Sequence, residues 1–529
     1  MKPAAILSLA MLTMSAAAAA LAAPAAPAAA AAPVAEATRA LYQQHCAACH
    51  AADRLGQMGP ALLPDNLARL RRDEALRVIR DGRPATQMPG FGEQLGEAEL
   101  AALADFIYTP VSPAPAWSAE AIRASRVVHA DPASLADKPV FAADPMNLFL
   151  VVEGGDHHVS VLDGDRLEPI HRFQSRFALH GGPKFTADGR YVFFGSRDGW
   201  ITKYDLWNLA VVAEVRAGIN TRNVAVSPDG RHVAVANYLP HSLVLLDGDL
   251  QLIKTIPALD QAGKRSSRVS AVYDATPRNS KVVALKDVPE VWEISYDENA
   301  EEIPVGLIHD FRMREGTFVP GYLNARRTLL QDPLDDFFFT QSYAELMGAS
   351  RDGVGQVVNL DVRRKIADLP LAGMPHLGSG ITWNWNGRTV MASTNLKAAE
   401  VTVIDLQSWE VVKRIPTRGP GFFLRSHGDS RYAFVDSMMS PEAKHILQVI
   451  DKQTLEVVKE IVGEPGRTLA HIEFTRDGRY ALASLWEEDG AVIVYDADTL
   501  QEVKRLPMSK PVGKYNVWNK ITRDEGTSH

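Results

Sequence analysis

The sequence predicts an N-terminal all-α domain over residues 34–112, followed by an all-β, eight-bladed propeller over residues 140–529. Two patterns predict this fold class. Apolar residues recur at helical spacing in three short stretches before residue 108, whereas strand–turn–strand units recur about every 40 to 50 residues after Val140. Residues 113–139 are expected to link the two domains.

Composition narrows the class of protein. Apolar residues make up 46% of the chain and charged residues 23%, values typical of a globular protein and unlike those of a disordered chain. The formal net charge of −8 argues against nucleic acid or an anionic membrane surface as the main partner. Two cysteines are too few for a fold held together by disulfides.

The start of the chain is typical of a secretory signal peptide, which we place at residues 1–23. Lys2 is followed by a short apolar core and by small residues up to Ala23. The alternative, an uncleaved membrane anchor, needs about 18 apolar residues to span a bilayer, and this core is shorter. An Ala/Pro-rich linker follows at residues 24–33, and no later segment is long and apolar enough to cross a membrane. We therefore expect an exported, periplasmic protein without stable membrane insertion.

Five consecutive residues, Cys46-Ala47-Ala48-Cys49-His50, form the attachment motif of a c-type haem. In this motif the two thiols add to the haem vinyl groups and the histidine coordinates the iron. A disulfide or redox pair would leave the histidine without a role. Because the chain has only these two cysteines, a four-thiolate zinc or iron–sulfur site is excluded. We expect one covalent haem c.

The surroundings of this motif resemble a small class I cytochrome c, in which short helices enclose the haem. Helical periodicity covers residues 35–48, 73–80 and 97–107. The loop around Met88 resembles the loop that supplies the sixth iron ligand in such domains, so Met88 is the predicted distal ligand and Met58 is the alternative. A haem with both axial positions filled carries electrons and does not bind substrate at its iron.

The second half of the chain repeats one unit, in which a turn precedes an alternating strand and further strands follow. The turns that mark these units are Asp188-Gly189-Arg190, Asp229-Gly230-Arg231, Asn386-Gly387-Arg388 and Asp477-Gly478-Arg479. About 390 residues at about 48 per blade predict eight blades. Seven blades stay an alternative, because residues 260–345 fit the repeat poorly. An insert at residues 301–333 is expected on one face, where loops can reach a ligand.

Together the two domains resemble the cytochrome cd1 family, whose eight-bladed propeller carries non-covalent haem d1. The resemblance is densest over residues 177–191 and at Arg197-Asp198-Gly199. It implies that His180 is the proximal ligand of a d1-type haem. Residues 513–519 match the segment that closes the propeller in this family.

The sequence departs from the family's nitrite reductases, which hold two distal histidines that protonate bound nitrite. Lys286 and Asp335 stand in the corresponding regions, and these groups donate protons near neutral pH only with shifted pKa values. The sequence is more similar to the branch that matures haem d1. In that branch, a protein with its own cytochrome c domain oxidises a propionate of dihydro-haem d1 to an acrylate and passes the electrons to its haem c. A nitrite reductase and a non-enzymatic haem d1 carrier are the alternatives.

The resemblance also implies binding partners and candidate site residues. The expected partners are the haem d1 precursor, other haem d1 maturation proteins, cytochrome cd1 nitrite reductase and a small periplasmic electron acceptor. For each candidate residue the alternative to a functional role is a purely structural one, as a charge on the blade surface or as a histidine hydrogen-bonded to the backbone. The candidate bases and distal-pocket groups are His376, His471, Lys286 and Asp335. The candidate cations for haem carboxylates are Arg197, Arg222 and Arg268.

Overall fold

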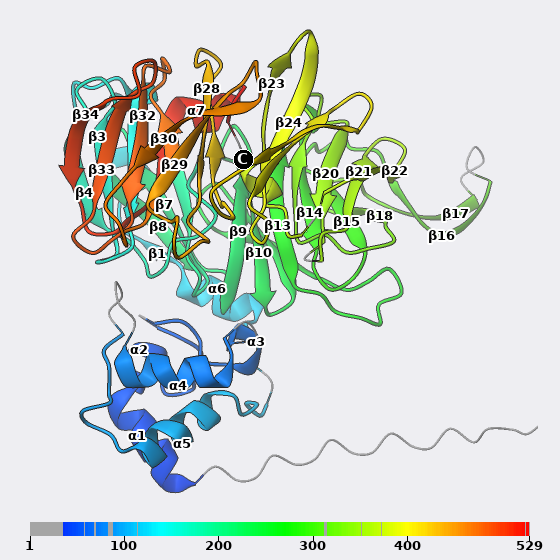
Figure 1. Cartoon of the computed structure of the whole chain (residues 1–529). Helices are drawn as coiled ribbons and strands as arrows, with labels where there is room; N and C mark the ends of the chain where they lie inside the picture. Colours follow the sequence, from blue (N-terminus) through cyan, green and yellow to red (C-terminus); the bar gives the residue numbers. More distant parts are fainter. Residues whose placement is uncertain are drawn as a thin grey trace, which may run out of the picture.

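Figure 1 shows the computed structural model of the chain, in which a small helical domain lies beneath a ring of β-sheets. The predicted signal peptide, the predicted Ala/Pro-rich linker at 24–33 and Met58 lie outside the described residues. The structure describes residues 35–57, 59–67, 70–82, 88–113, 115–310, 315–350, 352–371, 373–523 and 525–527. No helix among these residues is long and apolar enough to cross a membrane.

The helical domain packs three longer helices and two single turns around one apolar core. Its helices are α1 (Glu36–His45), α2 (Ala47–His50), α3 (Pro64–Leu67), α4 (Arg72–Asp81) and α5 (Glu97–Ile107). The buried residues of α5 include Leu100, Leu103, Ala104 and Ile107, which recur at helical spacing. The helix begins where the Glu99 carboxylate accepts the Gly96 N–H at 2.9 Å. These helices confirm the all-α prediction for this part of the chain.

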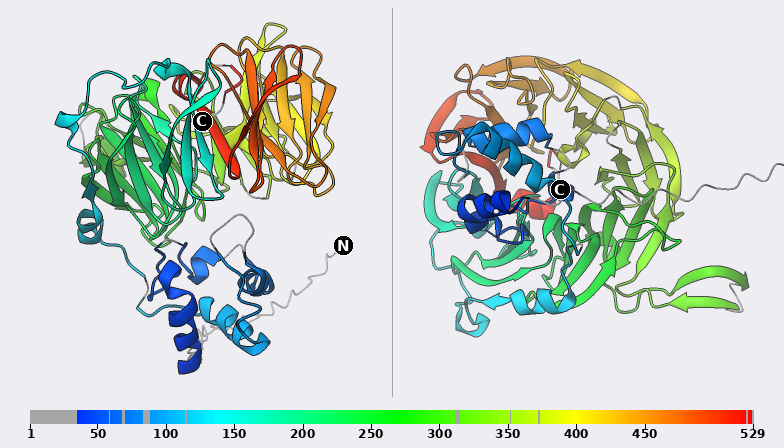
Figure 2. Two further views of the ribbon diagram at one scale, coloured as in Figure 1. Left: turned by 90° about the vertical axis from the view of Figure 1, so that its left-hand side faces the viewer. Right: turned by 90° about the horizontal axis from the view of Figure 1, so that it is seen from below.

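The rest of the chain forms eight radial sheets around a central axis, which confirms the eight-bladed propeller (Figure 2, right). Blade 1 consists of β2 (Leu148–Glu153), β3 (His158–Asp163), β4 (Glu168–Gln174) and β35 (Pro511–Asn516), and blade 2 of β5 (Lys184–Phe185), β6 (Tyr191–Gly195), β7 (Trp200–Asp205) and β8 (Ala210–Arg216). Blade 3 consists of β9 (Asn220–Val226), β10 (His232–Leu239), β11 (Ser242–Asp247) and β12 (Leu252–Pro257), and blade 4 of β13 (Val269–Ala275), β14 (Ser280–Leu285), β15 (Glu290–Ser295) and β18 (Ala325–Leu329). Blade 5 consists of β19 (Asp336–Phe339), β20 (Glu345–Ala349), β21 (Gly355–Asn359) and β22 (Arg364–Leu369), and blade 6 of β23 (Ile381–Trp385), β24 (Arg388–Thr394), β25 (Glu400–Asp405) and β26 (Val411–Pro416). Blade 7 consists of β27 (Leu424–Arg425), β28 (Tyr432–Asp436), β29 (Ile446–Asp451) and β30 (Glu456–Val462), and blade 8 of β31 (Leu469–Phe474), β32 (Tyr480–Leu485), β33 (Ala491–Asp496) and β34 (Glu502–Pro507). The single-turn 3-10 helices are η1 (Pro132–Ser134), η2 (Pro145–Asn147), η3 (Thr276–Arg278) and η4 (Leu377–Ser379).

Blade 1 closes the ring with strands from both ends of the propeller. The C-terminal strand β35 pairs antiparallel with β2, and its register sets Phe149 opposite Asn516 and Val151 opposite Lys514. The C-terminal end of the propeller therefore supplies the innermost strand of blade 1, and this strand closes the ring. The chain then continues into α7 (Val517–Thr522), on the face opposite the helical domain (Figure 1).

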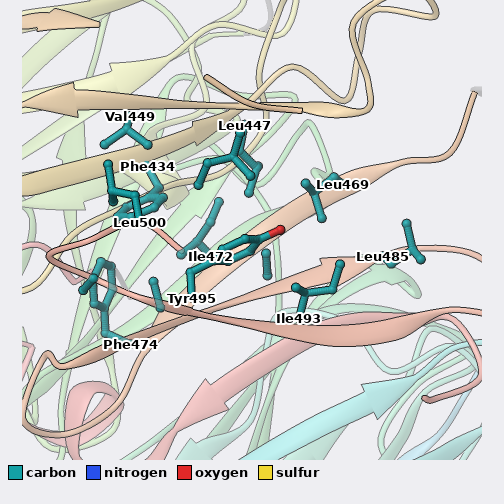
Figure 3. Packing of buried hydrophobic residues seen from close by; sticks show 14 of the residues in the cluster. Phe434, Leu447, Val449, Leu469, Ile472, Phe474, Leu485, Ile493, Tyr495 and Leu500 are labelled. Atoms are coloured by element: carbon teal, nitrogen blue, oxygen red, sulfur yellow. The ribbon is translucent and has the colours of Figure 1, made fainter. Parts of the chain in front are cut away.

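Packing between neighbouring blades supplies the apolar core. Successive residues of β33 point to opposite sides, so Ile493 and Tyr495 pack toward blade 7 while Val492 and Val494 pack toward blade 1. Figure 3 shows the first of these clusters, in which Phe474 and its neighbours fill the space between blades 7 and 8. A strand that is buried on both faces has a continuous run of apolar residues in its sequence.

Blade 4 explains the poor repeat at residues 260–345. A hairpin, β16 (Ile303–Asp310) and β17 (Glu315–Val319), is inserted between its third strand β15 and its outer strand β18. The hairpin projects outward from the rim (Figures 1 and 2). The insert expected to reach a ligand therefore points away from the propeller axis.

The two domains contact each other directly beneath blades 2 and 3 (Figure 2, left). Arg216 Nη2 donates to the Leu55 carbonyl at 2.7 Å. Ala61 and Leu63 of the helical domain share an apolar cluster with Ile219 and Leu239 of the propeller. The segment predicted as a linker, residues 113–139, contains α6 (Ala119–Ser125) and β1 (Val127–Val128), and β1 adds to the outer strand β8 of blade 2.

We expect Phe474→Ala to lower the free energy of unfolding of the propeller by about 3 to 5 kcal/mol, because a fully buried ring between two blades leaves a cavity. Val503→Ala is the matched control: it lies on the outer strand of the same blade, is 51% exposed and should change stability by about 0.5 kcal/mol or less. Urea unfolding followed by tryptophan fluorescence measures both. Equal shifts for the two variants would contradict the packing argument.

Candidate functional site

The first candidate site is the haem-attachment motif, which begins at Cys46, directly after α1, and covers the whole of α2. Cys46 and Cys49 are both half-buried and are not joined as a disulfide. His50 is 7% exposed, and its Nδ1 donates to the Pro60 carbonyl at 2.7 Å. Burial lowers the pKa of His50, which keeps the ring neutral. This hydrogen bond leaves the lone pair on Nε2, the atom that an iron ligand needs.

A glycine and a methionine complete the surroundings of this motif. A Cβ on Gly59 would lie 2.6 Å from Cε1 of His50, so the backbone can pass this ring only as glycine. Met88 and Cys46 pack against the same core cluster of the helical domain. These residues fit a covalent haem with His50 as one axial ligand, and Met88 stays the predicted second ligand.

The second candidate site is a cavity on the propeller axis. It lies where the inner strands begin, on the same side as the helical domain, because Ile219 packs against that domain and directly precedes β9. Residues from most of the blades line it, and no described residue of the outward hairpin does. The lining side chains discussed below are His180, Arg222, Tyr273, Asp336, His376, Phe422, Phe423, Arg425, His471, Trp486 and Tyr515.

His180 and His376 present the same nitrogen to this cavity. His180 Nδ1 donates to the Arg222 carbonyl at 2.8 Å, and His376 Nδ1 donates to the Phe422 carbonyl at 2.9 Å. Nε2 is then the acceptor on each ring, and that of His180 accepts from Arg222 Nη1 at 2.7 Å. Burial lowers the pKa of His376. Both histidines therefore suit a metal ligand as well as a base.

His471 is held differently, in a strained backbone. Its φ of +50° lies in the left-handed region, where β31 loses register with β32. Strain of this kind is concentrated at functional sites. The side chain is 2% exposed, its Nδ1 has no hydrogen-bond partner, and its ring lies 4.4 Å from Phe423 and 5.2 Å from Tyr515. Burial, assisted by the nearby Lys514 ammonium, lowers the pKa of His471 well below its usual value. The neutral ring is suited to accept a proton.

The cavity also contains functional groups that the sequence analysis missed. Arg425 is 5% exposed, donates from Nη1 to the Leu424 carbonyl at 3.3 Å, and its Nε lies 3.8 Å from Glu473. A guanidinium that lines a cavity with these weak contacts can bind a ligand carboxylate. One signal could have found it: Arg425 is a charged residue that directly ends the apolar run Phe422–Leu424.

A tyrosine and an aspartate form a second missed group. Tyr273 Oη donates to Asp336 Oδ1 at 2.8 Å, and the Gly378 N–H donates to Oδ2 at 3.1 Å. Burial, with the adjacent carboxylate, raises the pKa of Tyr273 well above its ordinary value, so its hydroxyl keeps the proton. Tyr515 lies against Gly182 and Gly513, and burial raises its pKa to about 12.

The other predicted residues lie away from the cavity or at its margin. Lys286 and Asp335 form an ion pair with each other, and Asp335 lines a smaller adjoining pocket. Arg268 pairs with Asp287, with its Nε at 2.9 Å from Oδ2. The described residues that line the central cavity do not include Lys286, Arg268 or Arg197. The roles assigned to them stay predictions that this geometry does not support.

Comparison with known proteins identifies the family. Residues 143–520 match the family described as Cytochrome D1 heme domain, and residues 33–107 match Cytochrome C oxidase, cbb3-type, subunit III. The chain belongs to the cytochrome D1 heme domain family. The expected resemblance and the N-terminal cytochrome c domain are thereby confirmed.

The similar proteins differ widely in their sequence identity to this chain. A dihydro-heme d1 dehydrogenase of Pseudomonas aeruginosa is 56% identical over 93% of this chain and 95% of its own length. A solved structure of dihydro-heme d1 dehydrogenase NirN in complex with DHE superimposes with a TM-score of 0.83 at 55% identity, covering 92% of this chain and 99% of that chain. Protein NirF and a nitrite reductase, both of Stutzerimonas stutzeri, are 29% and 24% identical, over 69% and 91% of this chain and 90% and 92% of their own lengths.

We expect Gly59→Ala to disturb the cytochrome c centre, because the new Cβ would overlap the His50 ring. The reduced protein should lose the intensity of its low-spin haem absorption bands and shift its midpoint potential. Gly96→Ala is the matched control, since its Cβ would meet only the Glu99 carboxylate at 3.6 Å. Unchanged spectra and potential in Gly59→Ala would show that the close contact with His50 is not needed.

Proposed function

We propose that this chain is a periplasmic dihydro-haem d1 dehydrogenase, which oxidises one propionate of dihydro-haem d1 to the acrylate and passes the electrons to its covalent haem c. One observation carries the proposal. The cavity is lined by His471, whose buried Nδ1 has no hydrogen-bond partner, and by Arg425, whose guanidinium is buried. The 56% identity to the Pseudomonas aeruginosa dehydrogenase supports the same activity.

The cavity offers each contact that a tetrapyrrole substrate needs. His180 would bind the substrate iron through Nε2 once Arg222 Nη1, which donates to that atom, turns to a substrate carboxylate. His376 offers the same nitrogen, so it would serve either as a second ligand or as a base. Arg222 and Arg425 bind substrate carboxylates by charge-assisted hydrogen bonds. The rings of Phe422, Phe423 and Trp486 add apolar contact with the macrocycle.

The reaction removes two hydrogens from a saturated carbon–carbon bond, which releases two protons and two electrons. A neutral base next to the propionate accepts the first proton from carbon, and His471 is the candidate because its Nδ1 has no hydrogen-bond partner. The second proton, from the neighbouring carbon, passes to Nε2 of His376, the second candidate base, or to water. Arg425 holds the carboxylate in place during this transfer. The covalent haem accepts one electron at a time. Two electrons per turnover therefore require a further acceptor, and a small periplasmic redox protein suits that role.

Nitrite reduction is disfavoured by the same side chains. It consumes protons, whereas burial lowers the pKa values of both His376 and His471 and makes them poor donors near neutral pH. Lys286 and Asp335 neutralise each other in an ion pair. A non-enzymatic haem d1 carrier would use the same cavity. Only oxidation of the bound pigment distinguishes the dehydrogenase from such a carrier.

Export and partners also belong to this proposal. Residues 1–23 act as the signal peptide, and haem c is attached after export. The product passes to other haem d1 maturation proteins or to cytochrome cd1 nitrite reductase. The relatedness of this chain to Protein NirF and to a nitrite reductase supports these partners.

Incubation of the haem c-loaded protein with dihydro-haem d1, without oxygen, should convert the pigment to a product lighter by two hydrogens. Reduction of the covalent haem should accompany this loss. Absorption spectroscopy and mass spectrometry of the extracted pigment measure both. Tight binding without a mass change would make the protein a carrier. Rapid nitric oxide formation from nitrite, with mature haem d1 bound, would make it a reductase.

His471→Ala should still bind dihydro-haem d1 through His180 but should lower its turnover by about 100-fold or more, the usual contribution of a general base. His376→Ala tests the second candidate in the same assay. His171→Ala, on the outer strand β4 of blade 1, is the control that should leave turnover unchanged. Unchanged turnover in both His471→Ala and His376→Ala would exclude the two histidines as the base.

A further inference from the structure

One buried carboxylate, that of Asp436, contacts the backbone beside both candidate bases. Asp436 is the last residue of β28 in blade 7, and its side chain is fully buried. The described residues that line the central cavity include Phe422, Phe423 and His471 but not Asp436. Asp436 therefore lies behind the groups that meet the substrate.

The first contact of Asp436 is with the segment Phe422–Phe423, which directly precedes the inner strand β27 of the same blade. The Phe422 N–H donates to Asp436 Oδ1 at 2.8 Å, and the Phe423 N–H donates to Oδ2 at 3.1 Å. The Asp436 N–H donates in return to the Phe423 carbonyl at 3.3 Å. Three hydrogen bonds thus fix this segment to one residue.

The same segment packs against both candidate bases. The ring centroid of Phe422 lies 4.0 Å from that of His376. The ring centroid of Phe423 lies 4.4 Å from that of His471. A displacement of the segment would therefore move the rings against which both histidines are packed.

A single peptide unit also connects Asp436 with the His376 ring. The carbonyl of this unit belongs to Phe422 and accepts from His376 Nδ1 at 2.9 Å, whereas its N–H belongs to Phe423 and donates to Asp436. Successive hydrogen bonds polarise one another. The carboxylate therefore makes the Phe422 carbonyl a stronger acceptor and the His376 ring more basic, as a carboxylate does when it accepts directly from a histidine.

Asp436 also contacts the strained backbone of His471. The His471 N–H donates to Asp436 Oδ2 at 3.5 Å, which is a long hydrogen bond. The His471 carbonyl accepts from Lys514 Nζ, which also donates to Ser484 Oγ at 2.9 Å. A non-glycine residue with a φ of +50° persists only where its surroundings hold it. A buried acid at its N–H and a buried lysine at its carbonyl supply that support.

We infer that Asp436 is a positioning residue for both candidate bases. It holds His376 through the segment Phe422–Phe423, and it holds His471 through its N–H. The two histidines belong to blades 6 and 8, and Asp436 in blade 7 lies between them, so one side chain sets their relative position. The inference deepens the proposed dehydrogenase function and rests on it, because that reaction releases two protons.

Asp436→Asn keeps the size of the side chain but cannot accept both phenylalanine N–H groups, because one of its terminal atoms becomes a donor. Turnover of dihydro-haem d1 should fall by about tenfold to 100-fold, while KM stays within about twofold. KM is spared because the pairing of β27 with β28 holds Arg425 independently. Burial raises the pKa of Asp436 to about 6, so steady-state kinetics at pH 7.5 compare an ionised side chain with a neutral one.

Asp451→Asn is the matched control. Asp451 ends β29 of the same blade, is fully buried, and its Oδ1 accepts the N–H groups of Gln453 and Thr454 at 2.8 and 3.0 Å. The described residues that line the central cavity do not include it, so this variant should keep both kcat and KM. Asp436→Ser, which is smaller and has no amide donor, keeps the test available should Asp436→Asn fail to fold.

A second measurement does not depend on catalysis. Nitrogen-15 NMR of histidine-labelled protein with reduced haem c reports the tautomer and surroundings of each ring. In Asp436→Asn the ring signals of His376 and His471 should shift or broaden. The signal of His180 should stay unchanged, because its Nδ1 donates to the Arg222 carbonyl. His376→Gln and His471→Gln assign the signals.

Three results would overturn the inference. They are unchanged histidine signals in Asp436→Asn, turnover equal to that of the wild-type protein, and equal losses of turnover in Asp436→Asn and Asp451→Asn, which would reflect general damage to blade 7. A wild-type protein that binds the pigment without oxidising it would instead contradict the proposed function. The NMR comparison would then still decide whether Asp436 positions the two histidines.

Discussion

The pairing of β35 with β2 is the constraint on which the rest of the structure depends. It joins residues more than 350 positions apart in one sheet and thereby closes the ring. Because β35 is an innermost strand, the same pairing brings Tyr515 into the central cavity and Lys514 beside His471. It also directs α7 across the far end of the axis, where Lys520 and Arg523 line a smaller pocket. The central cavity thus exists only in the closed ring.

One local device recurs at all three histidines that are suited to bind iron. The Nδ1 atoms of His50, His180 and His376 each donate to a backbone carbonyl, at 2.7, 2.8 and 2.9 Å. A backbone acceptor sets the tautomer without adding a charge, so the lone pair of each neutral ring lies on Nε2. His471 lacks such an acceptor on Nδ1, and this difference separates a candidate base from the candidate ligands.

Contacts between the domains connect the two predicted iron ligands. His50 bonds to Pro60, the next residue Ala61 packs with Ile219, and the backbone from Ile219 leads to the Arg222 carbonyl that accepts from His180. The proposed function requires electrons to pass between the propeller and the cytochrome c domain. These packed and hydrogen-bonded residues form a continuous connection between the two sites, and the hydrogen bond from Arg216 to the Leu55 carbonyl is a further contact between the domains.

The sequence by itself determined the features that arise from short-range patterns. The Cys46-to-His50 motif, the helical spacing of α5 and the repeating turns are local, and they predicted the haem c centre, the helical domain and the eight blades. Family resemblance predicted His180, which lines the cavity. The tertiary structure alone decided which side chains from different blades meet. It brought Arg425, Tyr273 and Asp336 together, paired Lys286 with Asp335, and turned the inserted hairpin outward. The physical reason is that contacts across a propeller axis depend on the register and closure of eight separate sheets, and no short stretch of sequence contains that information.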